Sequence, residues 1–370
     1  MVSGISTDIL AAIDKGCTPS MYLAAYSVSY TPPNRPRMTR AYSYDIDSEN
    51  IDMSSVHFEA SNIPGDELEP GGVIPAHLKL NLYEHDSTIW SRLSAYLESD
   101  HLGDFSYLYR MAIVYDDIPY LYGPFMAITN GKNVFGGGKT IELDEVSFVL
   151  ENRTFDFTSF STSTLDGVAT YLMQNAGFVF HSENIYDGAN NYTENQVNAR
   201  EALSRILQAN GLFLRSYAYG NDLTNGNYIA SPLLKKTGHD MEIHRKYVVD
   251  YDIASRRGRW ADAYVYVKGA NHPKWDYSTF VLDDNPLIVS GTTSAYRTQL
   301  QNNICSTFRQ GYSFQIPMMP FIELGDCYKF TYFPKPGSSF NTKELFYVSR
   351  IEWDGGALMR IEEASYNRNR

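Results

Sequence analysis

One segment near the C-terminus, residues 320–333 (PFIELGDCYKFTYF), constrains the fold of this chain more than any other. From Cys327 onward, small or polar side chains alternate with aromatic ones, and this period of two is typical of a β-strand with unlike faces. A turn is predicted just before the strand, because Gly325 can adopt positive φ and Asp326 can accept hydrogen bonds from nearby amides. We therefore expect Glu323 and Asp326 to form a turn rather than to act as a catalytic acid pair.

The composition favours a β-rich fold. Among the 370 residues are 29 Tyr, 19 Phe and 4 Trp, and aromatic rings suit the pleated, half-buried surfaces of sheets. The formal net charge of −12 argues against a protein that reads nucleic acid, which needs a basic face. The same charge suits a surface that must not adhere to DNA.

The three cysteines, Cys17, Cys305 and Cys327, are odd in number and lack a C-x-x-C spacing. They are predicted to be thiols in a reducing compartment rather than a disulfide framework. The N-terminus has no basic region followed by an apolar core, and no apolar stretch approaches about 18 residues. We expect the chain to be made in a cytoplasm.

Changes in pattern along the chain predict three domains. Residues 1–155 are rich in hairpin signals and predict a β domain, and residues 246–370 predict a second β domain with one helix. Between them, residues 156–245 predict a smaller α+β domain whose last hairpin turns at Asn225-Gly226. The fold class expected is β-rich α+β, with boundaries that are soft and possibly discontinuous.

A helix–glycine–strand unit occurs twice in the middle domain. The helix over 165–176 ends at Gly177, and the helix over 198–210 ends at Gly211. Asn198 and Glu201 have the spacing of a capping box at the start of the second helix. Two units are too few for a solenoid, so this segment predicts a compact α+β domain.

The periodicity of apolar residues and the turn signals predict the other elements. Helices are expected over 5–13 (capped by residues 6–8), 87–98 and 292–309; strands are expected over 21–30, 41–46, 77–83, 106–115, 120–128, 140–150, 247–253, 261–268, 344–353 and 357–365.

Two motifs resemble ligand-binding loops but lack residues that those loops require. Gly138-Lys139-Thr140 resembles the end of a phosphate-binding loop, but Asn133 stands where the first glycine is required, and a strand-like sequence follows. A hairpin turn is favoured there. Asp45, Asp47, Glu49 and Asp52 begin like a Ca²⁺ loop, but the turn glycine and the closing glutamate are missing, which favours a solvated turn.

The remaining candidates also favour structural roles. His239, Asp240 and His244 are the best spaced metal ligands among eight scattered histidines, with His85-Asp86 as another pair, but a surface turn is favoured. The basic turn Arg256-Arg257-Gly-Arg259 could bind a carboxylate or phosphate, although it favours an ordinary turn or a subunit contact. No G-x-S-x-G motif occurs. We therefore predict no catalytic, cofactor-binding or metal-binding residue.

Two segments carry a resemblance to a known family. They are residues 198–215 (NAREALSRILQANGLFLR) and the order Asp284-Asn-Pro followed by Pro320-Phe-Ile-Glu-Leu-Gly-Asp326. Together they resemble the baseplate hub family of tailed bacteriophages, which includes the N-terminal part of tail-associated proteins.

The resemblance implies a homotrimer in which each subunit carries two tail-tube-like β-barrel domains, one within 1–155 and one within 246–370. Such a ring would join a sixfold tail tube or distal tail protein to a threefold spike or fibre protein. Its channel would let tape-measure protein and DNA pass without specific binding. The location implied is the virion, at the tail tip or baseplate, after synthesis in the bacterial host. Many family members continue into a receptor-binding or lytic module, which would here be a separate polypeptide.

Two other classes stay open. An extracellular carbohydrate-binding protein or glycoside hydrolase would account for the aromatic residues and the acidic charge, and its paired carboxylates would not show in sequence. A phage receptor-binding protein is the second alternative.

Overall fold

A computed structural model describes residues 3–29, 37–63, 69–83, 107–128, 132–133, 138–160, 163–183, 185–186, 188, 196–217, 227–231, 241–253, 260–273, 279–305, 311–330 and 345–364. Within those ranges, none of the helices combines the length and the apolar character that crossing a membrane would require.

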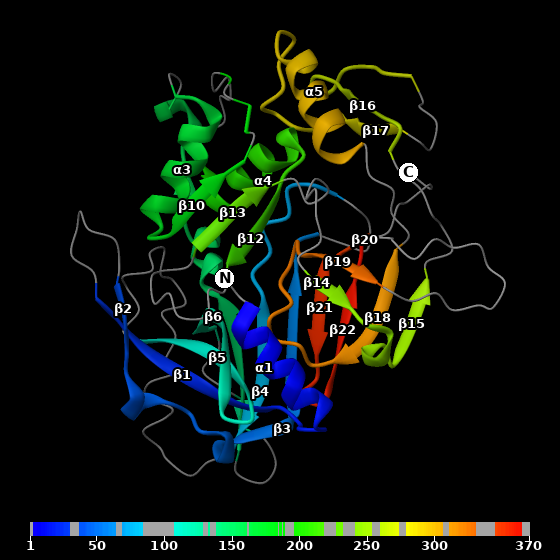
Figure 1. Cartoon of the computed structure of the whole chain (residues 1–370). Coiled ribbons are helices and arrows are strands. Elements are labelled where there is room, and N and C mark those ends of the chain that lie inside the picture. Colours follow the sequence, from blue (N-terminus) through cyan, green and yellow to red (C-terminus); the bar gives the residue numbers. More distant parts are fainter. Residues whose placement is uncertain are drawn as a thin grey trace, which may run out of the picture.

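A 12-stranded sheet forms the lower half of the molecule in Figure 1. Its strand order combines the two ends of the chain, and β21 pairs directly with β3, with Trp353 opposite Phe58. The path runs through β15 (Asp250–Ile253), β18 (Tyr312–Pro317), β22 (Leu358–Glu362), β21 (Arg350–Trp353), β3 (Ile51–Ser61), β4 (His77–Leu82), β8 (Lys139–Glu145), β6 (Ile118–Ala127), β5 (Tyr107–Tyr115), β1 (Ser20–Ser29) and β2 (Arg37–Arg40), with β7 (Lys132–Asn133) beside β8.

One face of this sheet packs on helix α1 (Ser3–Asp14) and on the segment 318–326; we call it the α1 face and its hydrophobic interior the sheet core. Tyrosines of the hairpin β5–β6 tie the segment down. The Tyr115 hydroxyl donates to the carbonyl of Met318 at 2.8 Å, and the Tyr122 hydroxyl donates to the carbonyl of Ile322 at 3.0 Å. Residues some 200 positions apart thus share one core.

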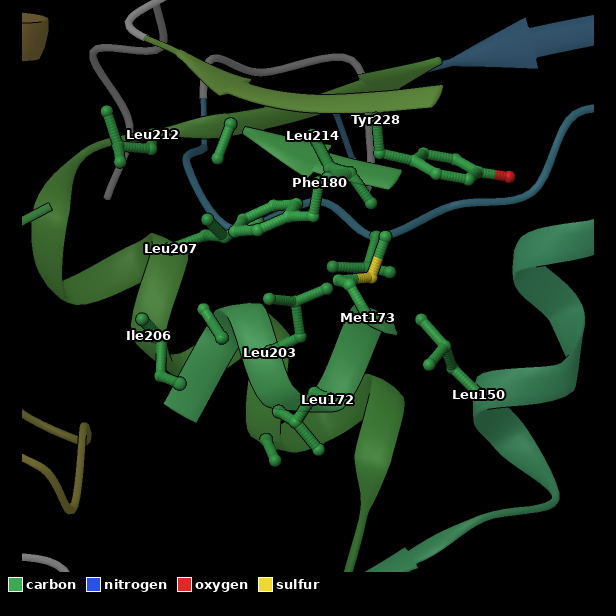
Figure 2. Close-up of a cluster of buried hydrophobic side chains, with 14 of the residues drawn as sticks. Leu150, Leu172, Met173, Phe180, Leu203, Ile206, Leu207, Leu212, Leu214 and Tyr228 are labelled. Carbon is green, nitrogen blue, oxygen red and sulfur yellow. The ribbon is translucent and has the colours of Figure 1, made fainter. Parts of the chain in front are cut away.

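The upper part of the molecule is an α+β unit with its own hydrophobic interior, the helical core. It contains α3 (Leu165–Asn175), α4 (Ala199–Asn210) and a sheet ordered β10 (Val179–Ser182), β13 (Asn227–Ser231), β12 (Phe213–Tyr217). Apolar side chains from both helices meet those of the sheet, as Figure 2 shows for Leu172, Met173, Leu203 and Phe180. The parallel pairing of β10 with β13 and the antiparallel pairing of β12 with β13 agree with the two predicted helix–strand units.

Elements from the C-terminal third complete this unit. Helix α5 (Thr293–Ile304) buries Tyr296 and Leu300 against it, and the Asn303 side chain donates to the carbonyl of Asn210 at 2.7 Å. The parallel pair β16 (Asp262–Val265) and β17 (Thr279–Leu282) lies beside α5.

Short elements connect these parts. They are β9 (Thr154–Phe155) paired with β11 (Val197–Asn198), a small sheet ordered β14 (Met241–Ile243), β19 (Cys327–Phe330), β20 (Leu345–Tyr347), and 3-10 turns η1 (Tyr42–Tyr44), η2 (Ser48–Asn50), η4 (Val146–Glu151), η5 (Phe157–Phe160) and η6 (Arg245–Tyr247).

Several local predictions are confirmed. The strands expected over 106–115 and 120–128 pair as the hairpin β5–β6, which turns at Asp116 and Asp117, both with positive φ, as the twist of a two-residue hairpin requires. Gly177 and Gly211 end α3 and α4 with φ of 99° and 66°. The Asn198 side chain caps α4 by accepting from the amides of Arg200 and Glu201.

Other predictions were wrong in their bounds. Residues 41–46 are not a strand, since β2 ends at Arg40 and a 3-10 turn follows. The strand expected over 140–150 ends at Glu145, and residues 245–247 are a 3-10 turn, so β15 begins only at Asp250. The strand expected over 344–353 is divided between β20 and β21, which lie in different sheets. The predicted cap at residues 6–8 lies inside α1.

Other predictions concern strand pairing or fall on residues that the structure does not describe. Strands β15 and β16 pair with β18 and β17. The basic turn expected between them, 256–259, lies outside the described residues. The helix expected over 87–98 and the Asn225-Gly226 turn lie outside the described residues. So do residues 306–309 at the end of the predicted helix 292–309.

The large sheet contains strands from both of the predicted β domains. Strands from 1–155 and from 246–370 form one continuous sheet, while α5, β16 and β17 pack on the middle unit. In the described residues the path has two ends, β15 and β2, so no barrel closes within it. The division into three domains stays a prediction.

Candidate functional site

The predicted loop motifs are structural where the chain is described. Lys139 and Thr140 lie at the start of strand β8 rather than before a helix, and the Thr140 hydroxyl donates to Asn81 Oδ1 at 2.6 Å. Asp45 accepts the amide of Ala25 at 2.8 Å and forms an ion pair with Arg40. Among the described residues, no group of three or more His, Cys, Asp or Glu side chains is arranged to hold a metal ion.

The histidines pair singly with carboxylates at separate places. His57 Nδ1 lies 2.7 Å from Asp354 Oδ1, and His77 Nδ1 lies 2.6 Å from Asp144 Oδ1. His272 Nε2 lies 2.7 Å from Asp283 Oδ2. The first two pairs join residues far apart in sequence, so the order of residues gave no signal for them.

Of the other named candidates, only part lies among the described residues. His244 accepts the amide of Lys246 at the start of η6, at 3.2 Å. Residues 85–86, 239–240 and 256–259 lie outside the described residues. None of the three cysteines forms a disulfide, and burial raises the pKa of the Cys305 thiol to about 12, so this thiol stays protonated and unreactive at neutral pH.

The turn before β19 has the predicted geometry. Gly325 has a φ of 80°, and its amide donates to the carbonyl of Val348 at 2.7 Å. The Asp326 carboxylate accepts from the Glu323 amide at 2.9 Å and from the Tyr328 hydroxyl at 2.8 Å. The Asp326 carboxylate is therefore committed to local structure.

Glu323 also binds the sheet. Its Oε1 accepts from the Tyr120 hydroxyl at 2.9 Å. Burial raises the pKa of Tyr120 and of Tyr122 far above the ordinary value for tyrosine, and the negative charge of the nearby Glu323 carboxylate raises it further. Both phenols therefore stay neutral donors and hold the turn against the hairpin β5–β6.

A buried carboxyl that the sequence did not indicate lies where the sheet meets the α+β unit. Glu145, the last residue of β8, accepts from the Ala76 amide at 3.3 Å and from the Tyr228 hydroxyl at 3.2 Å. Desolvation raises the pKa of Glu145, although hydrogen bonds from Ser216, Ala76 and Tyr228 oppose the shift. Figure 2 shows the Tyr228 ring extending out of the helical core.

The cavity beside Glu145 is small. It measures about 40 Å³ and is lined by residues of both cores, including Phe58 and Tyr122 of the sheet core and Leu214 and Tyr228 of the helical core. A volume of this size holds a water molecule or two, not a sugar ring. Glu145 therefore acts as a polar joint between the two parts of the molecule.

A larger hollow lies over β18, β22 and β21. It has a volume of about 400 Å³, and charged side chains of both signs line it, among them Asp252, Arg350, Arg360 and Glu362. Arg360 Nε lies 2.8 Å from Glu362 Oε1, and Arg350 Nη1 lies 3.7 Å from Glu362 Oε2. With Glu352 and Glu363 the lining has four carboxylates against two guanidiniums, so the hollow carries a net negative charge.

The fold itself has relatives among solved structures. Over 93% of this chain and 96% of the other, the structure matches the tail protein from Neisseria meningitidis MC58 with a TM-score of 0.50 at 10% identity. This chain therefore has the fold of that tail protein.

Other neighbours are of the same kind. The 43 kDa tail protein of prophage MuSo2 from Shewanella oneidensis covers 92% of this chain and 97% of its own, at 10% identity and a TM-score of 0.47. The E. coli c3393 protein is a type VI secretion component described as similar to the T4 tail proteins gp27 and gp5. It covers 86% of this chain and 74% of its own, at 10% identity and a TM-score of 0.45.

The expected resemblance to tail proteins is confirmed by the match to the tail protein from Neisseria meningitidis MC58. No family model matches the sequence, and no curated protein is significantly similar to it.

Proposed function

We propose that this chain is a structural protein of a phage tail or baseplate and that it is the hub. In this role three copies form a ring that joins the sixfold tail tube, or a distal tail protein, to a threefold spike or fibre. The observation that carries the proposal is the match of the fold to a tail protein along almost the whole of both chains. The location is then the virion.

Three features of the molecule support a structural role. The carboxylates best placed to act as an acid pair, Glu323 and Asp326, both accept hydrogen bonds that hold a turn. The two predicted tube-like barrel domains, within 1–155 and 246–370, would lie along the large sheet that both segments build. A net charge of −12 suits a channel through which tape-measure protein and DNA pass without binding.

The proposal is tested by the mass and shape of the purified protein. We expect light scattering to give three times the 42.0 kDa chain mass, and negative-stain microscopy to show a ring with a central channel. A chain that stays monomeric at high concentration, and that forms no ring when tail tube is added, would contradict the proposal.

The alternatives predict other results. A glycoside hydrolase would turn over a polysaccharide and lose activity when one carboxylate is changed; the cavity beside Glu145 is too small for that substrate. A receptor-binding protein would bind host cells directly as a purified chain. Either result, with no ring formed, would replace the hub proposal.

A further inference from the structure

Strand β15 ends the large sheet on one side. The Glu363 amide donates to the carbonyl of Tyr312, so the backbone N–H and C=O groups of Tyr312 point toward β22. Those of its neighbour Ser313 point toward β15. Because Asp252 is opposite Ser313, the backbone of Asp252 bonds to β18, and that of Tyr251 points outward. No strand of the described residues pairs with this outer edge.

The β15 edge is acidic and partly apolar. Asp250 and Asp252 are exposed, and Asp250 Oδ1 accepts the outward amide of Tyr251 at 2.8 Å. Val249 is 60% exposed and Tyr251 is 37% exposed. A carboxylate of the strand itself thus covers an edge amide that another strand could bind.

Strand β2 ends the sheet on the other side and is basic. The Ala41 amide donates to the carbonyl of Ala25, so the backbones of Met38 and Arg40 point away from β1. Arg40 is already paired with Asp45, while the side chain of Arg37 is exposed. No described strand pairs with this edge either.

An exposed aromatic ring adjoins β2 as well. Tyr42 is 76% exposed, and the Arg40 guanidinium lies 4.4 Å from the centre of its ring. The described residues expose five large hydrophobic side chains, and three of them lie at the two ends of one sheet: Tyr42, Val249 and Tyr251. A surface that pairs with another strand needs apolar side chains at these places.

We propose that β15 of one copy pairs with β2 of the next, so that the sheet continues from subunit to subunit; this rests on the proposed ring. The two edges belong to the same chain, differ from each other and carry opposite charge. A head-to-tail contact of this kind closes into a ring when the rotation allows it. It would also cover two edges that are otherwise open to aggregation.

The faces of the two edges fit one another. Tyr251 is opposite Phe314, a residue of the sheet core, and therefore lies on the α1 face. Met38 packs in the helical core, so Arg37, one position away, also lies on the α1 face. In a parallel pairing that places Thr39 opposite Tyr251, the α1 faces of the two copies are continuous. The Arg37 guanidinium then meets the ring of Tyr251, and the basic strand approaches the two aspartates.

The first test removes the edge amide. Tyr251→Pro removes the ring and the outward N–H and leaves the bonds to β18, whereas Tyr251→Ala removes the ring and keeps the amide. We expect the proline variant to raise the dissociation constant of the trimer roughly fivefold or more beyond the alanine variant, measured by analytical ultracentrifugation. Circular dichroism and the thermal midpoint establish that both variants fold. Equal dissociation constants in folded variants would overturn the proposal.

The second test changes the charge on the other edge. Arg37→Glu places a like charge near Asp250 and should weaken the trimer a few-fold at low salt, and less at high salt. Lys15→Glu is the matched control, because Lys15 is 67% exposed and lies in neither edge. An equal effect of the two reversals would count against the interface.

Disulfide trapping tests the contact directly. In a Cys17→Ser background, Thr39→Cys with Tyr251→Cys should cross-link neighbouring copies on oxidation, up to closed trimers. Thr39→Cys with Tyr83→Cys is the control, since Tyr83 is 46% exposed but adjoins neither edge. A trimer that forms without specific cross-links and tolerates Tyr251→Pro would refute this interface and leave the proposed hub standing. A wild-type chain that never assembles would refute both.

Discussion

The two hydrophobic cores of this molecule are built in different ways. The helical core takes most of its side chains from one stretch, from Val146 through Ala230, and adds others from α5, from β16 and β17, and from β1, β2, β5 and β6 of the large sheet. The sheet core joins residues from the two ends of the chain, as in the bond between Tyr115 and Met318, which are 203 positions apart. One core is therefore local in sequence, and the other depends on contacts between distant segments.

This difference has a physical consequence. A long loop must close before the distant contacts of the sheet core can form, whereas α3 and α4 can pack early. We infer that the helical core is the more independent of the two. The buried joint at Glu145 and Tyr228 then couples it to the sheet.

The largest effect is expected at the junction of the two chain ends. Phe58 is 1% exposed, lies opposite Trp353, and has its ring centre 5.4 Å from that of Tyr122. Phe58→Ala should lower the free energy of unfolding by about 3–5 kcal/mol, measured by urea denaturation. Leu203→Ala, in the helical core, is the matched control at about 2–5 kcal/mol.

Hydrogen exchange then tests the independence of the cores. Phe58→Ala should speed exchange at the amides of β3 and β21 while those of α4 stay protected. If Phe58→Ala and Leu203→Ala each speed exchange equally in β3, β21 and α4, the molecule has one cooperative core, and the two cores do not differ in independence.

The next effect concerns the turn that enters β19. Gly325 has a φ of 80° and is buried, so Gly325→Val should cost at least about 2 kcal/mol and reduce folding or assembly. Gly325→Ala should cost less, because alanine is not branched at Cβ. Soluble yield and thermal midpoint give the ranking. Loss of an enzymatic activity with folding and assembly intact would contradict the structural role of this turn.

The difference between the cores also explains what the sequence could show. The helix–glycine–strand units were predicted because their signals are local: an Asn198 cap, a Gly211 stop and apolar residues at helical spacing. The hairpin at Asp116 and Asp117 is local for the same reason. Elements of this kind depend on backbone conformation and on neighbours a few positions away.

The pairing of β21 with β3 has no local signal. Nothing in 350–353 indicates that its partner lies in 58–61, because any alternating strand would fit such a position. The carboxyl of Glu145 was missed likewise, since alternation in β8 assigns it a face but not the tyrosine that buries it. Contacts between distant segments are set by the whole fold.

A smaller effect is expected at the cap of α4. The Asn198 Oδ1 atom lies 2.9 Å from the amide nitrogen of Arg200, and Asn198→Ala should cost about 1 kcal/mol of stability. Asn198→Asp keeps an acceptor and should cost less. The Glu201 carboxylate bonds to Arg205 instead of closing the capping box, so Glu201→Ala should change stability by less than about 0.5 kcal/mol. A larger cost for Glu201→Ala than for Asn198→Ala would show that the cap is not what holds this helix.

The smallest effect is a pH dependence in the large sheet. The hydrogen bond to Asp144, with the charge of that carboxylate, raises the pKa of His77 above its ordinary value of 6.5, against a lowering by burial. Because the folded pKa is the higher one, the stabilisation is complete below about pH 6.5 and is lost as pH rises through the folded pKa. The His77 side chain is 34% exposed, so solvent screening limits the effect to less than about 1 kcal/mol. His77→Asn and Asp144→Asn should each flatten the slope of unfolding free energy between pH 6 and 8, measured by urea denaturation across that range. Because this pair links β4 to β8 within the sheet, hydrogen exchange at the amides of α4 should not follow the same pH dependence. If it does, the contact between Glu145 and Tyr228 transmits the change, and the helical core is less independent than inferred.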